Sequence, residues 1–113
     1  THDRARFNWS QDALTLKPEL FIGGVTFGWI KGVTKSMKLI QSSGYVEKIE
    51  TPILAVLAGD ETVVDNEMTL SLLARMKNAE YQIIEGARHE IYREIDEYRN
   101  PLLVKIDAFL ETR

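Results

Sequence analysis

The chain has no cysteine, two histidines and three prolines among its 113 residues, and its net charge is −3. Without cysteine it can form neither a disulfide framework nor a zinc site built on thiolates. The two histidines lie far apart, which argues against a metal centre, and a mildly acidic chain lacks the basic face of a nucleic-acid-binding protein. No apolar run reaches the roughly 18 residues of a membrane span, and no signal peptide is visible. These absences favour a small globular domain that is cytoplasmic or peripheral to a membrane, without a metal, a cofactor or a nucleic-acid partner.

The first part of the chain favours helices. Residues 1–16 are charged and lack Gly and Pro, so we expect a helix that ends before Pro18. The following stretch, 20–29, has three glycines among aromatic residues and is expected to be a loop. After it, apolar residues recur at spacings of 3, 4 and 3, which predicts an amphipathic helix to about Gln41. These apolar positions are Ile30, Val33, Met37 and Ile40.

The later part of the chain favours strands that alternate with helices. The apolar run Ile53–Gly59 does not alternate with polar residues, which is typical of a parallel strand covered on both faces. A helix is expected from Asp65 or Asn66 to about Lys77, with Asp65 as its N-cap. The sequence "AEYQIIEG" predicts a second strand. An α/β fold is therefore expected, in which the two strands are parallel and joined by a right-handed crossover.

Two points about this fold stay open in the sequence. Asp96 could cap the last helix, or Asn100 could cap it with Pro101 in the first helical position. The first strand needs cover on both faces, yet the chain offers it only one partner strand. The implied sheet is therefore larger than the sheet that these residues can build.

Each predicted strand is followed by a residue suited to acid–base chemistry. Asp60 follows the first strand and His89 follows the loop after the second. Sites form at the carboxyl ends of parallel strands, which lie about 4.8 Å apart. We therefore expect Asp60 to hold one ring nitrogen of His89 and leave the other free as a general base. Structural interpretations stay open beside this one, because Gly-Asp is common in turns and a lone histidine is often only solvated. Glu90 could support His89 or be a surface charge.

Two motifs, in this order and separated by one helix, resemble the α/β-hydrolases of the lysophospholipase and monoacylglycerol lipase group, the serine aminopeptidase S33-type family. "IETPILAVLAGDETVVDN" is similar to the strand and acid turn of that family, and "IIEGARHEIYREIDEYR" to its final strand and histidine loop. The resemblance implies the C-terminal part of an α/β-hydrolase fold, with its last two parallel strands and flanking helices in residues 49–113. Residues 1–48 would form a helical segment next to the cap. The resemblance also implies that Asp60 and His89 are the acid and base of a catalytic triad.

A third stretch carries the resemblance into the first part of the chain. "DRARF…PELFIGGVTFGWIKG" resembles the cap-proximal helices of bacterial lysophospholipases, whose loop usually reads Gly-Gly-Pro-Thr-Tyr-Gly-Trp. Val25 replaces the proline and Phe27 the tyrosine. The resemblance implies a small glycerol-backbone lipid ester as the substrate. Phe27 and Trp29 are then candidates for binding its acyl chain, although a role in the core is equally open for both rings.

The nucleophile of such an enzyme is missing from these residues. Enzymes of this fold carry it in a Gly-x-Ser-x-Gly elbow, and no such sequence occurs here. The chain also begins with Thr1 and not Met, so either its start was processed or it is a piece of something longer. Because the elbow is missing, we expect a fragment that holds the acid and the base and is inactive alone. Its exposed first strand is expected to self-associate or to pair with the missing N-terminal half. A noncatalytic binding module, or a peptidase or acyltransferase on the same scaffold, stays open.

Overall fold

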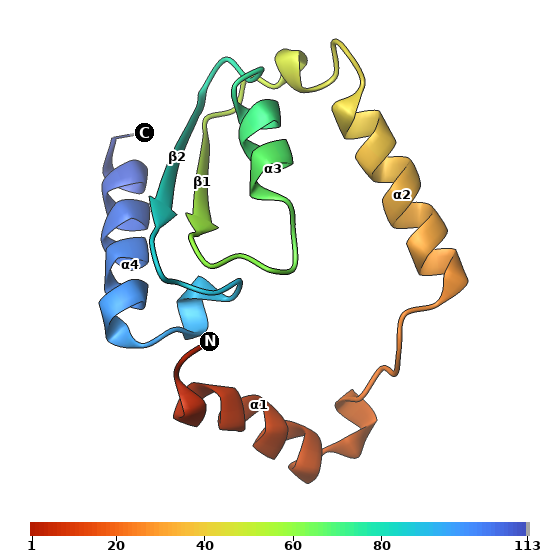
Figure 1. Cartoon of the computed structure of the whole chain (residues 1–113), viewed down its shortest axis with the longest axis vertical. Helices are drawn as coiled ribbons and strands as arrows, with labels where there is room; N and C mark the ends of the chain where they lie inside the picture. Colours follow the sequence, from red (N-terminus) through yellow and green to blue (C-terminus); the bar gives the residue numbers. More distant parts are fainter. Residues whose placement is uncertain (113) are drawn as a thin grey trace.

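A computed structural model describes residues 1–112, and Figure 1 shows its helices and its two strands. The elements in chain order are α1 (Arg4–Leu16), the short 3₁₀-helix η1 (Pro18–Leu20), α2 (Phe27–Gln41), η2 (Val46–Lys48), β1 (Ile53–Ala58), α3 (Asn66–Leu73), β2 (Ala79–Ile84), η3 (Ile91–Arg93) and α4 (Asp96–Glu111). The expected order of helices in the first part and alternating strands and helices in the second is confirmed.

The first three α-helices begin at side chains that accept a hydrogen bond from a backbone amide three residues later. The capping residues and their amides are Asp3 and Arg6 in α1, Thr26 and Trp29 in α2, and Asp65 and Met68 in α3. Such a cap satisfies one of the amides that a helix leaves unpaired at its start. The predicted capping role of Asp65 is confirmed, which leaves that carboxylate committed to α3.

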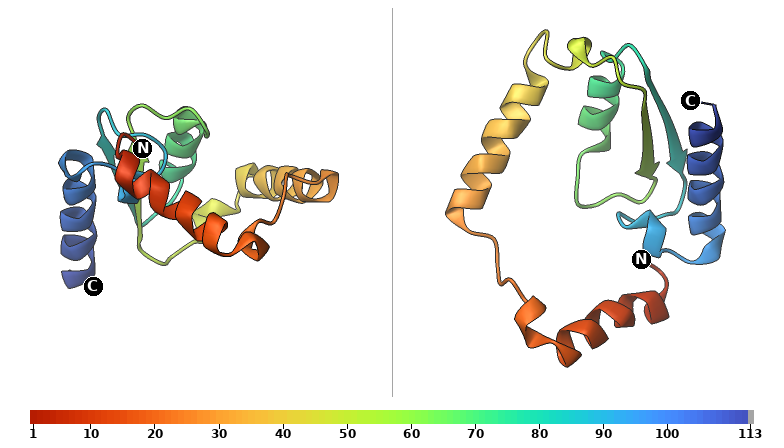
Figure 2. Two further views of the ribbon diagram at one scale, coloured as in Figure 1. Left: turned by 90° about the horizontal axis from the view of Figure 1, so that it is seen from below. Right: turned by 180° about the vertical axis from the view of Figure 1, so that it is seen from behind.

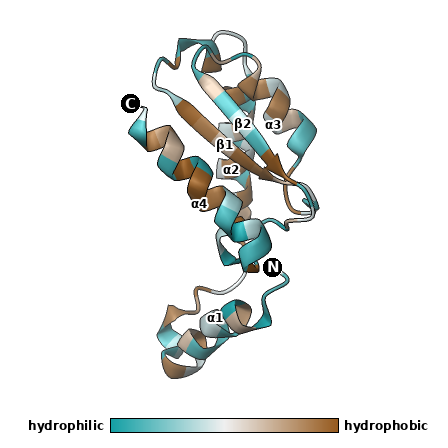
Figure 3. Cartoon of the chain, turned by 90° about the vertical axis from the view of Figure 1, so that its left-hand side faces the viewer, coloured by the Kyte–Doolittle hydropathy of each residue, from teal (hydrophilic) through white to brown (hydrophobic). Residues whose placement is uncertain are grey.

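The two strands are parallel, as predicted, with Ile53 opposite Ala79 and Ala58 opposite Ile84. Among the described residues β1 has β2 as its only hydrogen-bonded neighbour, so its other edge is unpaired. Figure 3 shows that β1 is hydrophobic along its length, whereas β2 mixes hydrophilic and hydrophobic residues. A strand of this composition at an open edge is unusual, because natural edge strands are commonly charged or covered.

The end of α3 differs from the expectation, and the start of α4, which the sequence left open, has Ile95 and not Asp96 or Asn100 at its N-cap. α3 ends at Leu73, four residues before Lys77, because the chain tightens there into turns in which Arg75 and Met76 each donate to the carbonyl three residues back. α4 begins at Asp96 and contains Pro101 in its interior. Proline has no backbone N–H to donate, so at this sixth position α4 lacks the hydrogen bond to the carbonyl of Glu97.

The hydrophobic core lies at the carboxyl ends of the two strands. Its buried side chains come from the carboxyl ends of both strands, the turn after β2, η3 and α4; they are Ala58, Ile84, Ala87, Ile91 and Leu102. This packing fixes the loop after β2 against α4, and that loop carries His89.

The first two α-helices stand apart from this core. In the right-hand view of Figure 2 both α1 and α2 lie away from the strands, and no residue of either helix is buried. The radius of gyration is 16.7 Å, compared with about 13 Å for a compact domain of this length. The predicted apolar stripe of α2 is therefore uncovered, and Met37 on that stripe is 52% exposed.

Candidate active site

His89 is paired with a carboxylate from the loop after β1. Its Nδ1 lies 2.7 Å from Oε2 of Glu61. The Glu61 side chain is only 6% exposed, whereas that of His89 is 42% exposed. The buried partner is thus the acid, and the imidazole reaches the surface.

The Glu61 carboxylate is held by its own loop as well as by the histidine. Its Oε1 accepts hydrogen bonds from the backbone amides of Thr62 at 2.9 Å, Val63 at 2.7 Å and Val64 at 3.3 Å. Burial is the largest single influence on the pKa of Glu61 and raises it. The hydrogen bonds from His89, Val63 and Val64 together outweigh burial and hold that pKa at about 2. Glu61 is therefore ionised at any ordinary pH.

This ionised carboxylate determines which nitrogen of His89 carries the proton. A carboxylate can only accept hydrogen bonds, so Nδ1 must donate. In the neutral imidazole Nε2 is then unprotonated, and no group within residues 1–112 forms a hydrogen bond with it. The geometry thus provides a free basic nitrogen whose ring orientation is fixed from the opposite side, which is the arrangement of a general base.

The predicted contact between Asp60 and His89 is wrong, because Glu61 supplies the carboxylate. The Asp60 side chain is exposed, and its backbone amide donates to the carbonyl of Ala87 at 2.9 Å. Gly59 continues the pairing in the same way, with its amide 2.9 Å from the carbonyl of Ile84. Asp60 therefore joins the two loops through its backbone, and the next residue is the first whose side chain reaches the histidine.

Close packing between the strand ends explains the glycine before Asp60. A Cβ atom at Gly59 would lie 2.7 Å from Cα of Glu85 and 3.0 Å from the amide nitrogen of Gly86, both of them backbone atoms. No side chain fits in that space. Gly86 has a φ of +79°, a left-handed conformation that favours glycine, and it turns the chain from β2 toward His89.

The other candidate residues lie elsewhere in the structure. Glu90 accepts from Nη1 of Arg93 at 2.8 Å and from the hydroxyl of Tyr92 at 3.2 Å, so its carboxylate contacts these residues and not His89. Phe27 is 93% exposed at the start of α2, and Trp29 is 60% exposed. Trp29 lines a pocket formed with residues 22–26, which contains neither member of the Glu61–His89 pair.

A small pocket lies beside the Glu61–His89 pair. Its volume is about 210 Å³, and it is lined by Ala55, Val56, Leu57, Ala58, Glu61, Val64, Asn66, Thr69 and His89. Successive side chains of a strand point to opposite faces, so a pocket that touches four consecutive residues of β1 runs along the edge of that strand. The open edge of β1 and the Glu61–His89 pair thus border the same space.

The described residues show neither a metal-binding cluster nor a membrane-spanning helix. Within residues 1–112 no group of three or more His, Asp or Glu side chains is placed to hold a metal ion. No helix in that range is long and apolar enough to cross a membrane.

Two parallel strands, each followed by a loop that carries one member of an acid–histidine pair, are compatible with the carboxyl edge of an α/β-hydrolase fold. The family model described as "Serine aminopeptidase, S33" matches residues 1–96, and the chain belongs to this family. The resemblance seen in the two motifs is thereby confirmed. The chain is also similar to the "Probable lysophospholipase L2" of Haemophilus influenzae, with 31% identity over all 113 residues. It spans 36% of the length of that relative. No solved structure gave a significant match.

Proposed function

We propose that this chain supplies the base and the acid of a serine-dependent carboxylic ester hydrolase, with His89 as the base and Glu61 as the acid. The observation that carries the proposal is the 2.7 Å contact between His89 Nδ1 and the buried Glu61 carboxylate, which leaves Nε2 without a hydrogen-bond partner among residues 1–112. This assigns to Glu61 the role that the sequence indicated for Asp60. Membership of a family of serine hydrolases supports the choice of a serine as the third member.

The reaction follows from these positions. Nε2 of His89 takes the hydroxyl proton of a serine as the serine oxygen bonds to the ester carbonyl carbon. The ester C–O bond then breaks, and the leaving alcohol takes that proton from Nε2. Water attacks the acyl-serine in the second half of the reaction, gives one proton to Nε2, and releases the fatty acid as the proton returns to serine. Glu61 stays ionised throughout and stabilises the imidazolium that forms twice per turnover.

Within this proposal, residues 49–113 form the C-terminal part of an α/β-hydrolase core and residues 1–48 a helical segment near its cap. The serine lies in residues outside this chain, since none of its serines stands in a Gly-x-Ser-x-Gly sequence. The pocket along the open edge of β1 supports this arrangement, because a further strand paired there would border the pocket that His89 lines. The chain alone either self-associates across that edge or pairs with the segment that carries the serine.

The proposed substrate is a small lipid ester of the lysophospholipid or monoacylglycerol kind. The name of the Haemophilus influenzae relative supports this class. Phe27 and Trp29 remain proposed contacts for the acyl chain, and their exposure on α2 leaves both rings accessible to such a ligand.

The test measures ester hydrolysis by the longest gene product that contains these 113 residues, with lysophospholipid and monoacylglycerol as substrates. We expect Glu61→Gln to lower kcat by about 10²- to 10⁴-fold and His89→Ala by about 10⁴-fold or more. Asp60→Asn is the matched control, since it makes the same chemical change one residue away, and its kcat should stay within about twofold of the wild type.

Three results would overturn parts of this proposal. A large loss in Asp60→Asn with normal activity in Glu61→Gln would return the role of the acid to Asp60. Ester hydrolysis by the isolated 113-residue chain, abolished in His89→Ala, would show that the nucleophile lies within it. Faster cleavage of amino-acid anilides than of lipid esters would replace the ester substrate with a peptide.

A further inference from the structure

A second buried acid lies behind the histidine loop, and the hydrolytic reaction proposed above does not use it. The Glu94 side chain is fully buried, between η3 and α4. Burial is the largest influence on its pKa and raises it. Hydrogen bonds from the amides of His2, Arg88 and Ile95 and from the His2 ring outweigh burial and hold the pKa at about 2. Burying an ionised carboxylate away from solvent costs free energy unless hydrogen bonds compensate, and these donors explain why Glu94 stays ionised.

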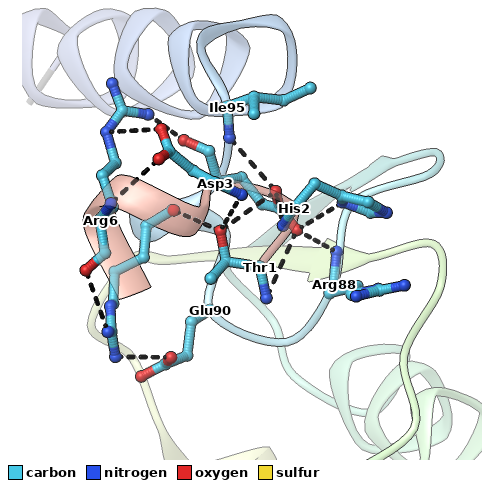
Figure 4. Close-up of polar contacts among 9 residues, drawn as sticks. Thr1, His2, Asp3, Arg6, Arg88, Glu90 and Ile95 are labelled. Atoms are coloured by element: carbon cyan, nitrogen blue, oxygen red, sulfur yellow. Dashed lines mark hydrogen bonds and ion pairs between the residues drawn. The ribbon is translucent and has the colours of Figure 1, made fainter. Parts of the chain in front are cut away.

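The donors come from three separate parts of the chain, as Figure 4 shows. Oε1 accepts from the amide of Arg88 at 3.1 Å and lies 3.0 Å from Nδ1 of His2. Oε2 accepts from the amide of His2 at 2.8 Å and from the amide of Ile95 at 3.2 Å. One carboxylate thus joins the segment ahead of α1, the histidine loop and the start of α4.

The position of Arg88 gives this network a consequence for the site. Arg88 is the residue immediately before His89, so the bond from its amide to Glu94 fixes the backbone that carries the imidazole. Glu61 holds the imidazole ring of His89 through its Nδ1 atom. His89 is therefore held at two points, the ring by one buried glutamate and the backbone by another.

We propose that Glu94 is a positioning residue for His89, and that His2 completes the hydrogen bonds of its carboxylate so that the segment ahead of α1 and the histidine loop are held as one unit. This inference rests on the proposed role of His89 as the base. Glu94 touches neither the imidazole nor the space beside Nε2 and acts through the backbone of Arg88. The geometry needs both carboxylate oxygens, since Oε1 contacts the Arg88 amide and the His2 ring, whereas Oε2 accepts from the amides of His2 and Ile95 and, at 3.4 Å, from the hydroxyl of Thr1.

The substitution Glu94→Gln tests this arrangement. Glutamine keeps one oxygen and places an NH₂ group where the second oxygen accepted backbone amides, so donors face donors. Glu97→Gln is the matched control, because it makes the same change on the exposed side of α4. His2→Phe provides a milder change, since it removes the ring nitrogen and keeps a ring near Tyr98, whose centroid is 5.7 Å from that of His2.

The measurement is NMR on the 113-residue chain, with amide hydrogen exchange and the Nδ1 proton signal of His89 as readouts. In Glu94→Gln we expect exchange at Arg88 to rise about tenfold or more and the His89 Nδ1 signal to broaden. In His2→Phe exchange at Arg88 should rise about fivefold. The amides of β1 and β2 should exchange at their wild-type rates in both variants, and Glu97→Gln should match the wild type throughout.

Two outcomes would overturn the inference. If all amides exchange faster in step, Glu94 only stabilises the fold and does not position the base. If Arg88 and His89 are unchanged, the buried carboxylate does not hold the loop. Should Glu94→Gln fail to fold, the same two readouts in His2→Phe decide between these cases.

Activity separates this inference from the proposed function. In the longest gene product, Glu94→Gln should lower kcat about tenfold to a hundredfold at an unchanged KM, because a displaced base slows the chemical step and leaves binding intact. Equal activity of Glu94→Gln and Glu97→Gln would refute the positioning role alone. Activity that does not depend on His89 would refute the proposed function, and the NMR result would still report on the loop.

Discussion

The Glu61 carboxylate should make the stability of the chain depend on pH in a specific window. Its pKa is about 2 in the folded chain, compared with an ordinary value of 4.5. Each pKa unit corresponds to about 1.4 kcal/mol, so ionised Glu61 contributes on the order of 3 kcal/mol to the free energy of unfolding. Because the folded pKa is the lower one, this contribution is complete above about pH 4.5 and is lost as the pH falls toward 2.

The substitution Glu61→Gln removes this titration and keeps the shape of the side chain. We expect the variant to be less stable than the wild type at neutral pH by on the order of 3 kcal/mol, and the difference to vanish near pH 2. Glu94 titrates in the same window, but it is present in both proteins and cancels in the difference. Urea unfolding from about pH 7 to about pH 2, at one protein concentration, gives both stability curves.

The exposed acid next to Glu61 provides the control for this experiment. Asp60→Asn should follow the wild-type curve, since the Asp60 side chain is exposed and does not contact His89. Parallel curves for the wild type and Glu61→Gln would show that the Glu61 carboxylate is not paired in the folded chain. A flattened curve for Asp60→Asn would instead show that Asp60 carries the interaction.

Three further predictions concern local stability and association. Gly59→Ala should destabilise the chain by about 1–3 kcal/mol in urea unfolding, because its Cβ would contact the Glu85 backbone; Gly32→Ala, in open space on α2, should instead raise the helical content measured by circular dichroism. Asp65→Ala should cost about 1 kcal/mol through loss of the α3 cap, and an unchanged unfolding midpoint would contradict that role. Size-exclusion chromatography with light scattering across a dilution series should show association through the open edge of β1, and a monomer at every concentration would refute it.

The sequence predicted the fold of the second part of the chain well because local signals and long-range packing agree there. The apolar run of β1, the cap at Asp65 and the glycine turn at Gly86 each specify their own element, and parallel pairing follows from the helix between the strands. The end of α3 was missed because it depends on tertiary contacts. Nε of Arg75 donates to Glu47 at 2.8 Å, and its two other nitrogens donate to carbonyls at the end of α2.

The carboxylate that contacts His89 was predicted to the correct loop and the wrong residue. Two acids follow β1 in direct succession, and sequence reasoning chose Asp60 because it comes first after the strand. The backbone of Asp60 still takes part in pairing with the next loop, which turns its side chain away from His89. A usable signal was the longer side chain of Glu61 followed by Thr62, Val63 and Val64, whose amides are free to bind it. Glu94 gave no such signal, because two of its partners come from His2.

All the hydrogen bonds of the Glu61 carboxylate come from residues that follow β1 in the chain. The Glu61 carboxylate is oriented by the three amides that follow it, and His89 lies in the loop after the adjacent strand, so this contact forms within residues 53–89. A break in the polypeptide ahead of β1 leaves every one of these bonds within one piece. The bonds between His2 and Glu94 would instead join the two pieces, and they would form only when the pieces meet.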